Sequence, residues 1–318
     1  MDAPIVIVMF NRPQCVKKLL ERIEIVKPKR LFVISDGPRE NVQSDYQLVK
    51  ECQQIVDKMV SWPCEIHKIY ATENLGCGRR LPTGLDEVFK LVDRAIILED
   101  DCIPEVTFFR YCEELLEKYY SDTRIYSISG NNFFQHEEST NSYFFSIFPQ
   151  TCGWATWRRV WQEYDYEIKK WPTFRDAKVL KNLFNDYRFA NIWETFFQAC
   201  YDKVYLTAWD YQFSFLSFCN HGLNIIPAVN LIKNIGFDES ATHIKDSDCA
   251  LAKMMSITKP ISFPLDHPYI YQENFNYDRK CWCIWGYEEG DVKYYLKRSL
   301  SLLKKILKRI YMQVKCSQ

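Results

Sequence analysis

The first 130 residues of this chain alternate short apolar runs with segments whose apolar residues recur at helical spacing. The apolar runs are residues 4–10, 31–35, 65–70 and 95–98, and an amphipathic segment follows each of them. Runs that are apolar throughout indicate strands buried on both faces, as in a parallel sheet covered by crossover helices. The alternation therefore predicts an α/β fold whose mostly parallel, Rossmann-like sheet is flanked by helices.

Polar residues follow each of these runs at the point where the strand is expected to end. They are Asn11 and Arg12, Asp36 and Gly37, residues 74–80, and the acidic triplet Glu99-Asp100-Asp101. Because ligands of such sheets bind at the carboxyl ends of the strands, we expect these residues to meet at one edge. No GxGxxG follows the first run and no GxxxxGK[ST] occurs, which argues against dinucleotide-binding and P-loop proteins.

The acidic triplet comes directly after the fourth apolar run. Adjacent carboxylates repel one another, and removing them from water is costly unless a cation meets them. One interpretation is a solvated turn whose acids favour the N-terminus of a helix that starts near Pro104. The other is a site for Mn²⁺ or Mg²⁺, which binds through one or two carboxylates together with phosphate oxygens and water. The position at the end of a central strand favours the cation site.

Several short motifs occur in an order that resembles the GT-A glycosyltransferases. The run from Ile97 to Asp101 resembles the EDD version of their DxD motif, and the other motifs are FNRP, SDGP, NLGCGRR, EDDCIP, SGNNFF, GWATWRRVW, WDYQ and NIGF. The chain is similar in this respect to the N-acetylglucosaminyltransferase I family (glycosyltransferase family 13) and to a group of bacterial nucleotide-diphospho-sugar transferases. The resemblance covers most of residues 1–245 and does not extend beyond about residue 250.

The resemblance implies a role for each residue that matches a donor-site motif. Asp101 corresponds to the direct metal ligand, and Glu99 and Asp100 correspond to residues that hold the ribose and the donor sugar. Arg12 would meet the diphosphate as a charge-assisted hydrogen-bond donor, and Asp36 would contact the uracil or the ribose. These residues imply a site for a nucleotide-diphospho-sugar with Mn²⁺ or Mg²⁺ as cofactor.

Four more residues take roles from the remaining motifs. Arg79 and Arg80 are candidates for diphosphate or sugar contacts, although their segment departs from the animal enzymes. The Trp-Asp step of WDYQ makes Asp210 the candidate general base, and the alternative is an N-cap on the following helix. His243 would reach the phosphates or the metal if its loop closed over the donor, and the alternative is an exposed loop histidine.

The tryptophans near the middle of the chain are expected to divide their roles. Trp154, next to Gly153 in a predicted loop, is the candidate for stacking on the acceptor. Trp157 and Trp161 are four positions apart, as on one face of a helix, and are expected in the core. Trp209 is expected to hold the neighbouring aspartate in place.

The resemblance implies a metal-dependent glycosyltransferase that moves a sugar from a UDP-sugar, similar to UDP-GlcNAc, to a glycan or a lipid-linked acceptor. A single base implies inversion at the anomeric carbon. A protein acceptor stays open, as does a non-catalytic nucleotide- or carbohydrate-binding protein on the same fold. A sugar-nucleotide pyrophosphorylase is a further alternative. It would require a Gly-rich loop after the first strand, where this chain has FNRPQC.

The chain is expected to form one catalytic unit over residues 1–245, followed by two further segments. The nucleotide-sugar half covers residues 1–130, and the half with the acceptor site and the catalytic base covers residues 131–245. An extension occupies residues 246–290, and a basic amphipathic helix occupies residues 291–318.

The last segment changes sharply in composition. Residues 293–318 contain eight Lys or Arg residues and no acid, with four leucines and an isoleucine at helical spacing. A basic amphipathic helix of this kind binds the anionic surface of a membrane. The alternative is a helix that packs on the domain through its apolar stripe, and the two states can hold in turn.

Charge and cysteine content bear on partners and location. The 41 basic and 41 acidic residues cancel, and the basic segment lacks interleaved stacking aromatics, so we expect no nucleic-acid partner. The 13 cysteines without a repeated spacing, and a first strand close to Met1, indicate free thiols in a reducing compartment. No apolar run approaches the ~18 to 20 residues of a membrane span. We therefore expect a cytoplasmic protein, peripheral on the membrane if its last helix binds there.

Overall fold

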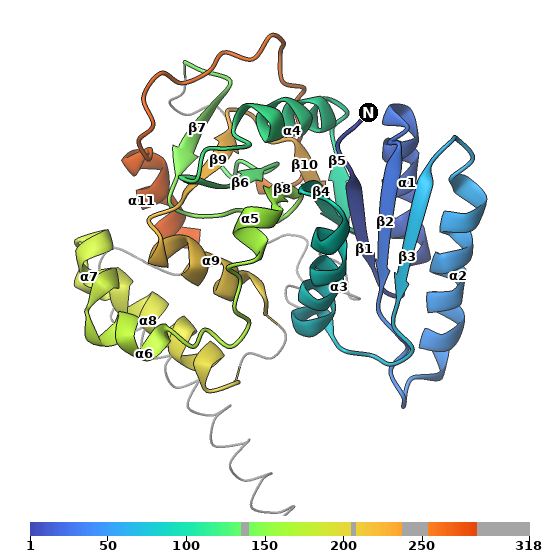
Figure 1. The fold of residues 1–318 in the computed structure, drawn as a ribbon, viewed down its shortest axis with the longest axis horizontal. Coiled ribbons are helices and arrows are strands. Elements are labelled where there is room, and N and C mark those ends of the chain that lie inside the picture. The colour runs from blue at the N-terminus through green and yellow to red at the C-terminus, as the bar shows by residue number, and fades with distance from the viewer. Residues whose placement is uncertain (135–139, 205–207, 237–253, 285–318) are drawn as a thin grey trace, which may run out of the picture.

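The computed structural model describes residues 1–134, 140–204, 208–236 and 254–284. Its centre is an eight-stranded sheet with the order β3-β2-β1-β4-β8-β6-β9-β7, and a two-stranded sheet pairs β10 with β5 (Figure 1). The strands are β1 (Ile5–Met9), β2 (Arg30–Ser35), β3 (Glu65–Tyr70), β4 (Arg94–Glu99), β5 (Cys102–Pro104), β6 (Ile125–Ser129), β7 (Tyr143–Ser146), β8 (Trp154–Trp157), β9 (Leu223–Pro227) and β10 (Ile232–Asn234). Among these strands, β7 and β8 run antiparallel to their neighbours in the large sheet and the other pairings there are parallel. The predicted mostly parallel α/β sheet is confirmed.

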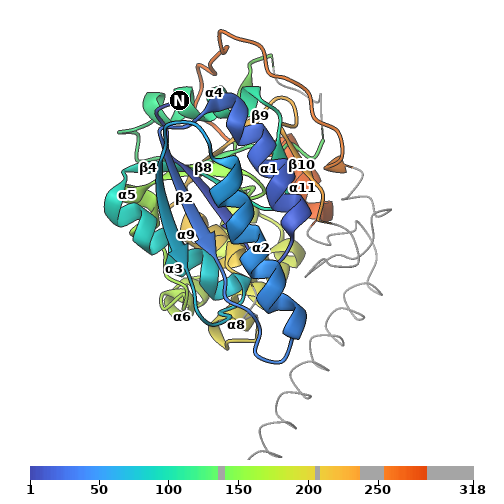
Figure 2. The same cartoon turned by 90° about the vertical axis from the view of Figure 1, so that its right-hand side faces the viewer.

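Helices connect the strands and cover the sheet. They are α1 (Pro13–Val26), α2 (Gln43–Met59), α3 (Cys77–Leu91), α4 (Thr107–Lys118), α5 (Arg158–Trp161), α6 (Trp171–Asp176), α7 (Val179–Phe184), α8 (Tyr187–Tyr201), α9 (Asp210–Cys219) and α11 (Phe275–Ile284). Helices α1 and α2 lie together on one face of the β1–β4 part of the sheet, and α3 lies on the other (Figure 1 and Figure 2). The sheet is therefore covered on both faces, which is why its first strands are apolar throughout.

The first four strands form where the apolar runs predict them. Strand β3 has the predicted bounds, and β1, β2 and β4 differ by one residue at one end or at both. The parallel register aligns Val8 of β1 with Glu99 of β4, and Met9 of β1 with Ser35 of β2. The carboxyl ends of these three strands therefore lie at one edge of the sheet, as the sequence predicts.

Strand β8 enters the sheet between β4 and β6 and turns its two tryptophans to opposite faces. Trp154 stacks on Trp209 beside α9, whereas the indole of Trp157 donates a hydrogen bond to the backbone carbonyl of Leu116 in α4. The predicted loop position of Trp154 is wrong, and since only 1% of this residue is exposed, its indole offers no open face to an acceptor. Trp157 and Trp161 lie in the core as predicted, although Trp157 belongs to the strand and not to a helix.

A second apolar cluster, mainly aromatic, joins α6–α9 to α11. In it Trp193 stacks on Phe148 with 5.9 Å between ring centroids, and Trp282 of α11 stacks on Phe189 with 4.5 Å. Aromatic residues bury large apolar areas, so this cluster accounts for part of the high aromatic content of the chain. The described part of the segment after residue 245 is thus tied to the core through α11.

Two predicted features lie outside the described residues. They are His243, which follows β10 in the sequence, and the predicted basic helix over residues 291–318. Among the helices of the described ranges, none combines the length and the apolarity that crossing a bilayer requires. Contact of His243 with the phosphates or the metal, and binding of a membrane surface through residues 293–318, stay predictions.

Asp278 of α11 gives the fold a pH-dependent stability. Its carboxylate is 3% exposed and accepts hydrogen bonds from the hydroxyl of Ser146 and from the backbone N–H of Ile147. Burial, with a smaller contribution from the charge of Glu273, outweighs the lowering effect of the two hydrogen bonds and raises the pKa of Asp278 from 3.8 to about 7. The folded chain therefore holds a proton here that the unfolded chain releases at lower pH.

We expect the free energy of unfolding to fall as the pH rises from about 4 to about 7, because over this range the folded state binds more protons than the unfolded state. Since one pKa unit corresponds to about 1.4 kcal/mol, the contribution of Asp278 to this fall is about 4 kcal/mol. Replacing Asp278 with Asn should flatten the profile, as measured by urea unfolding at several pH values. Equal slopes in the wild type and the variant would contradict this account.

Candidate active site

The candidate site begins where the carboxyl ends of β1 and β4 meet. The backbone N–H of Asp100 donates to the carbonyl of Val8, which continues the pairing of β1 with β4 as far as the acidic triplet. Nη1 of Arg12, the residue before α1, lies 3.1 Å from Oδ2 of Asp101 and 3.9 Å from Oδ1 of Asp100. The structure therefore brings the predicted diphosphate-binding cation into contact with the predicted metal ligand.

Burial and mutual repulsion disfavour the ionised form of this acidic triplet. Burial, followed by the charges of the neighbouring carboxylates, raises the pKa of Glu99 to about 8 and that of Asp100 to about 7. The guanidinium of Arg12 lowers both pKa values, and the backbone N–H of Phe10 donates to Asp100. One arginine thus compensates the triplet only in part, and a further cation at this position would stabilise its ionised form.

Strand β10 brings a third segment against Asp101. The amide of Asn234 donates to Oδ1 of Asp101 at 3.4 Å, and the backbone N–H of Ile235 donates to the carbonyl of Asp101 at 2.9 Å. A Cβ atom at Gly236 would stand 2.0 Å from Oδ2 of Asp101, so only glycine fits here without displacing the carboxylate. The sequence singled out NIGF as a motif but did not show that it packs on Asp101, because β10 pairs with β5 and not with its neighbour β9.

Replacing Gly236 with Ala is expected to displace the Asp101 carboxylate and to weaken metal-dependent nucleotide binding about tenfold or more. The added methyl group requires the Oδ2 atom to move, since contacts below 3 Å are not sustained. Isothermal titration calorimetry with Mn²⁺ and the nucleotide measures the affinity, and thermal unfolding checks that the fold is intact. Unchanged affinity in a folded variant would show that the position of Asp101 does not matter for binding.

Asp210 lies at the start of α9 and within electrostatic reach of the triplet. Its charge contributes to the raised pKa of Glu99 and, after burial and Glu99, to the raised pKa of Cys77 at the start of α3. The N-cap of α9 is Trp209, with no side-chain capping bond, so Asp210 belongs to the first turn and is not the cap that the alternative interpretation required. The hydroxyl of Tyr164 donates to the carbonyl of Trp209 at 3.0 Å and fixes this turn.

Asp36 differs from the expectation that it faces the donor. It is 5% exposed, and its carboxylate accepts hydrogen bonds from the backbone N–H groups of Gly37, Leu75 and Gly76 and from the amide of Asn74. All of these donors belong to the carboxyl ends of β2 and β3 or to the segment that leads into α3. In the free protein Asp36 therefore orders the loop beside the site.

The two arginines of α3 have different surroundings. Arg80 is 7% exposed, and its guanidinium donates to the carbonyls of Ser35 and Ile69, which joins the ends of β2 and β3. The sequence predicted that Arg80 contacts the sugar donor, but in the free protein its guanidinium is already hydrogen-bonded to these two carbonyls. Arg79 is exposed and lies over the ring of Tyr166 at 4.1 Å from the centroid, so it stays a candidate for contact with a bound molecule.

The residues at this edge fit a divalent cation that arrives with a nucleotide. Within the described ranges, no three side chains of the His, Cys, Asp or Glu type converge on one metal position. Mg²⁺ bound with nucleotides typically takes one or two carboxylates and completes its shell with phosphate oxygens and water. The side chain of Asp101 is 20% exposed, which leaves its carboxylate accessible to such an ion.

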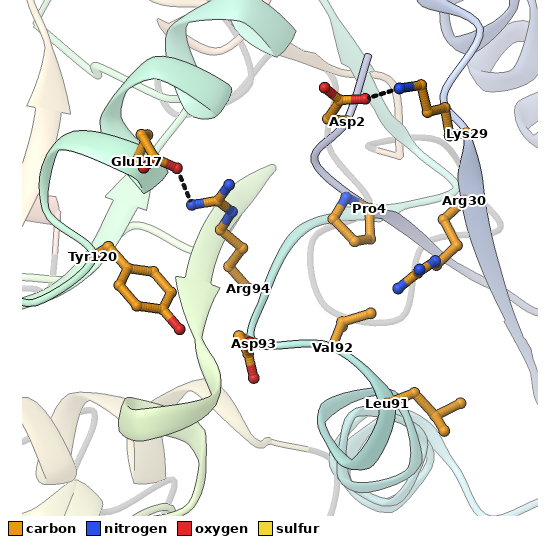
Figure 3. A pocket seen from close by; sticks show the side chains of 10 residues that line it. All are labelled: Asp2, Pro4, Lys29, Arg30, Leu91, Val92, Asp93, Arg94, Glu117 and Tyr120. Atoms are coloured by element: carbon orange, nitrogen blue, oxygen red, sulfur yellow. Dashed lines mark hydrogen bonds and ion pairs between the residues drawn. The ribbon is translucent and has the colours of Figure 1, made fainter.

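A separate hollow lies at the opposite edge of the sheet, near the amino ends of β1, β2 and β4 (Figure 3). It has a volume of about 580 Å³ and is lined by both basic and acidic side chains. Lys29 is paired with Asp2 at 2.5 Å, and Arg94 is paired with Glu117 at 2.5 Å, as the dashed lines in Figure 3 mark. These charges already compensate one another, so the candidate site is the carboxyl edge and not this hollow.

No family model matches the sequence, and no curated protein matches it. The solved structures that match part of the chain include the following three. The 4-diphosphocytidyl-2C-methyl-D-erythritol synthase of Anaerococcus prevotii is 10% identical over 51% of this chain and 76% of its own, with a TM-score of 0.32. HddC of Yersinia pseudotuberculosis is 12% identical over 54% of this chain and 86% of its own, with a TM-score of 0.32. A UDP-glucose pyrophosphorylase bound to UDP-glucose is 11% identical over 46% of this chain and 63% of its own, with a TM-score of 0.27. Similarity at this level assigns no activity to the chain.

Proposed function

We propose that this chain is a metal-dependent glycosyltransferase that moves a sugar, with inversion, from a nucleotide-diphospho-sugar to a glycan or lipid-linked acceptor. The main support is the contact of Arg12 with Asp101 at the carboxyl edge of the sheet, with the charge of Asp210 close to Glu99. A diphosphate accompanied by a divalent cation carries the charges that this arrangement lacks. The motif order that resembles the GT-A family supports the same reading.

In this proposal the residues around β4 bind the donor. Asp101 holds the cation, and Arg12 turns from Asp101 to the diphosphate, where its planar donors match phosphate oxygens. Glu99 and Asp100 accept hydrogen bonds from the ribose and the donor sugar. When bound, Mn²⁺ or Mg²⁺ supplies Lewis-acid stabilisation of the charge on the leaving diphosphate. Asp36 acts indirectly, by holding the loop that borders the site.

Asp210 takes the role of general base for the acceptor hydroxyl. Asp210 lies in the first turn of α9, and the hydrogen bond from Tyr164 to the carbonyl of Trp209 holds this turn in place. A general base needs such a rigid position because it must reach the hydroxyl proton directly. The base removes that proton while the acceptor oxygen attacks the anomeric carbon from the face opposite the leaving group. Attack from this face inverts the configuration at the anomeric carbon. Residues 1–130 then bind the donor, and residues 131–245 supply the base and the acceptor site.

Titration calorimetry with a panel of nucleotides and nucleotide sugars, in Mn²⁺ and in EDTA, tests the proposal. We expect metal-dependent binding of one nucleotide class, with uridine preferred as in UDP-GlcNAc. Product analysis then separates the alternatives: sugar transfer releases the nucleoside diphosphate, whereas a pyrophosphorylase forms a nucleoside triphosphate from pyrophosphate. Binding by none of the nucleotides, in a folded sample, would exclude the proposed function. The membrane contact and the lipid-linked acceptor are proposed from the sequence alone.

A further inference from the structure

Two cysteines that are far apart in the sequence meet beside the candidate site. Sγ of Cys102, in β5, lies 3.1 Å from Sγ of Cys152, which precedes Gly153 and strand β8. Both are free thiols. Cys102 is 1% exposed and Cys152 is half-buried, so a small solute reaches Cys152 first.

The two thiols share hydrogen-bond partners with the proposed metal ligand. Sγ of Cys102 donates to Oδ1 of Asp101 at 3.5 Å. The amide of Asn234 donates both to Oδ1 of Asp101 and to Sγ of Cys152, at 3.4 Å in each case. A chemical change at either sulfur therefore alters the contacts that position Asp101.

We propose that Cys102 and Cys152 form a reversible disulfide when the protein meets an oxidant of the hydroperoxide class. The Cys152 thiol is oxidised to a sulfenic acid while the O–O bond breaks and the peroxide is reduced to water or an alcohol. The Cys102 sulfur then attacks the sulfenic sulfur, and the disulfide forms with loss of a water molecule. From the observed contact, closure needs a movement of about 1 Å along the line between the sulfurs.

The disulfide changes two interactions at the site. Cys102 no longer has a thiol proton to donate to Asp101, and the shift of the sulfurs toward one another alters the contact of Cys152 with the amide of Asn234. We expect nucleotide and Mn²⁺ to bind about tenfold more weakly to the oxidised protein. This consequence rests on the proposed function, whereas formation of the disulfide does not.

Disulfide mapping of the full chain tests the bond itself. The reduced protein is treated with hydrogen peroxide, alkylated and digested, and mass spectrometry is expected to find the Cys102 and Cys152 peptides linked, with release by dithiothreitol. Cys152→Ser should yield no such link, whereas Cys64→Ser, at an equally half-buried cysteine before β3, should keep it. Unlinked Cys102 and Cys152 peptides in treated, folded wild-type protein would overturn the proposal.

Calorimetry on the same samples tests the consequence. Tenfold weaker binding after oxidation in the wild type and in Cys64→Ser, restored by dithiothreitol, supports the link between the thiols and Asp101. A mapped disulfide with unchanged binding overturns that link. If the reduced protein binds no nucleotide, the proposed function fails while the mapped disulfide stands, so the two failures are distinguishable.

Discussion

Replacing Asp101 with Asn is expected to weaken metal-dependent nucleotide binding at least about 100-fold, since even groups that only support a metal ligand affect affinity by about 10- to 100-fold. The amide keeps the size of the side chain, but its single oxygen can replace only one of the two carboxylate oxygens that accept hydrogen bonds from Arg12 and Asn234. It lacks the negative charge that a hard divalent cation requires. Calorimetry with and without Mn²⁺ measures the loss, and in EDTA we expect the variant and the wild type to bind equally weakly.

Asp93→Asn provides a matched control for this variant. Asp93 directly precedes β4, whereas Asp101 lies just beyond the other end of this strand. The carboxylate of Asp93 forms an ion pair with Arg158 at 2.9 Å. We expect its affinity for nucleotide to equal that of the wild type. If Asp101→Asn retained tight, Mn²⁺-dependent binding, the metal would have to be held elsewhere and the assignment of Asp101 would be wrong.

Replacing Asp210 with Asn is expected to lower turnover about 10³-fold while nucleotide affinity stays within about twofold, because general-base catalysis contributes about 10²- to 10⁴-fold. The side chain lies in the first turn of α9, where loss of a negative charge costs about 0.3 to 1 kcal/mol of stability. The fold should therefore survive. Once an acceptor is known, turnover is measured by release of the nucleoside diphosphate.

Asp202→Asn is the control for Asp210. Asp202 is the exposed C-cap residue of α8. Among the described residues, its carboxylate accepts hydrogen bonds only from the side chain of Gln198. Its turnover should match that of the wild type. Full activity in Asp210→Asn would remove the base assignment, and a large loss of nucleotide affinity would place Asp210 in the donor site.

The sequence predicted the N-terminal part of the sheet well because the information needed there is local. An apolar run followed by an amphipathic segment reports burial on both faces, and β3 appears with the predicted bounds, Glu65–Tyr70. Parallel strands place their carboxyl ends at one edge, so the meeting of Arg12 with Asp100 and Asp101 follows from the same pattern. The acidic triplet needed no knowledge of distant contacts to be singled out.

Side-chain roles were predicted less well, because they depend on partners that residue type does not reveal. Asp36 and Arg80 have the charges expected of donor contacts, yet both are buried. Asp36 accepts hydrogen bonds from backbone groups just before α3, and Arg80 donates to carbonyls at the ends of β2 and β3. Trp154 follows a glycine, which suggested a loop, but it pairs with Ile97 and Ser129 inside the sheet. Burial against distant strands decided each case.

The sequence by itself thus determined the α/β class, the first four strands and the edge at which charged residues gather, since each depends on local periodicity. Only the tertiary structure decided that β8 runs between β4 and β6, and that β10 pairs with β5. It also decided that Gly236 packs on Asp101 and that Cys102 touches Cys152. These contacts join segments 25 or more residues apart, and short stretches of similar pattern can pair in many ways until the whole core is packed.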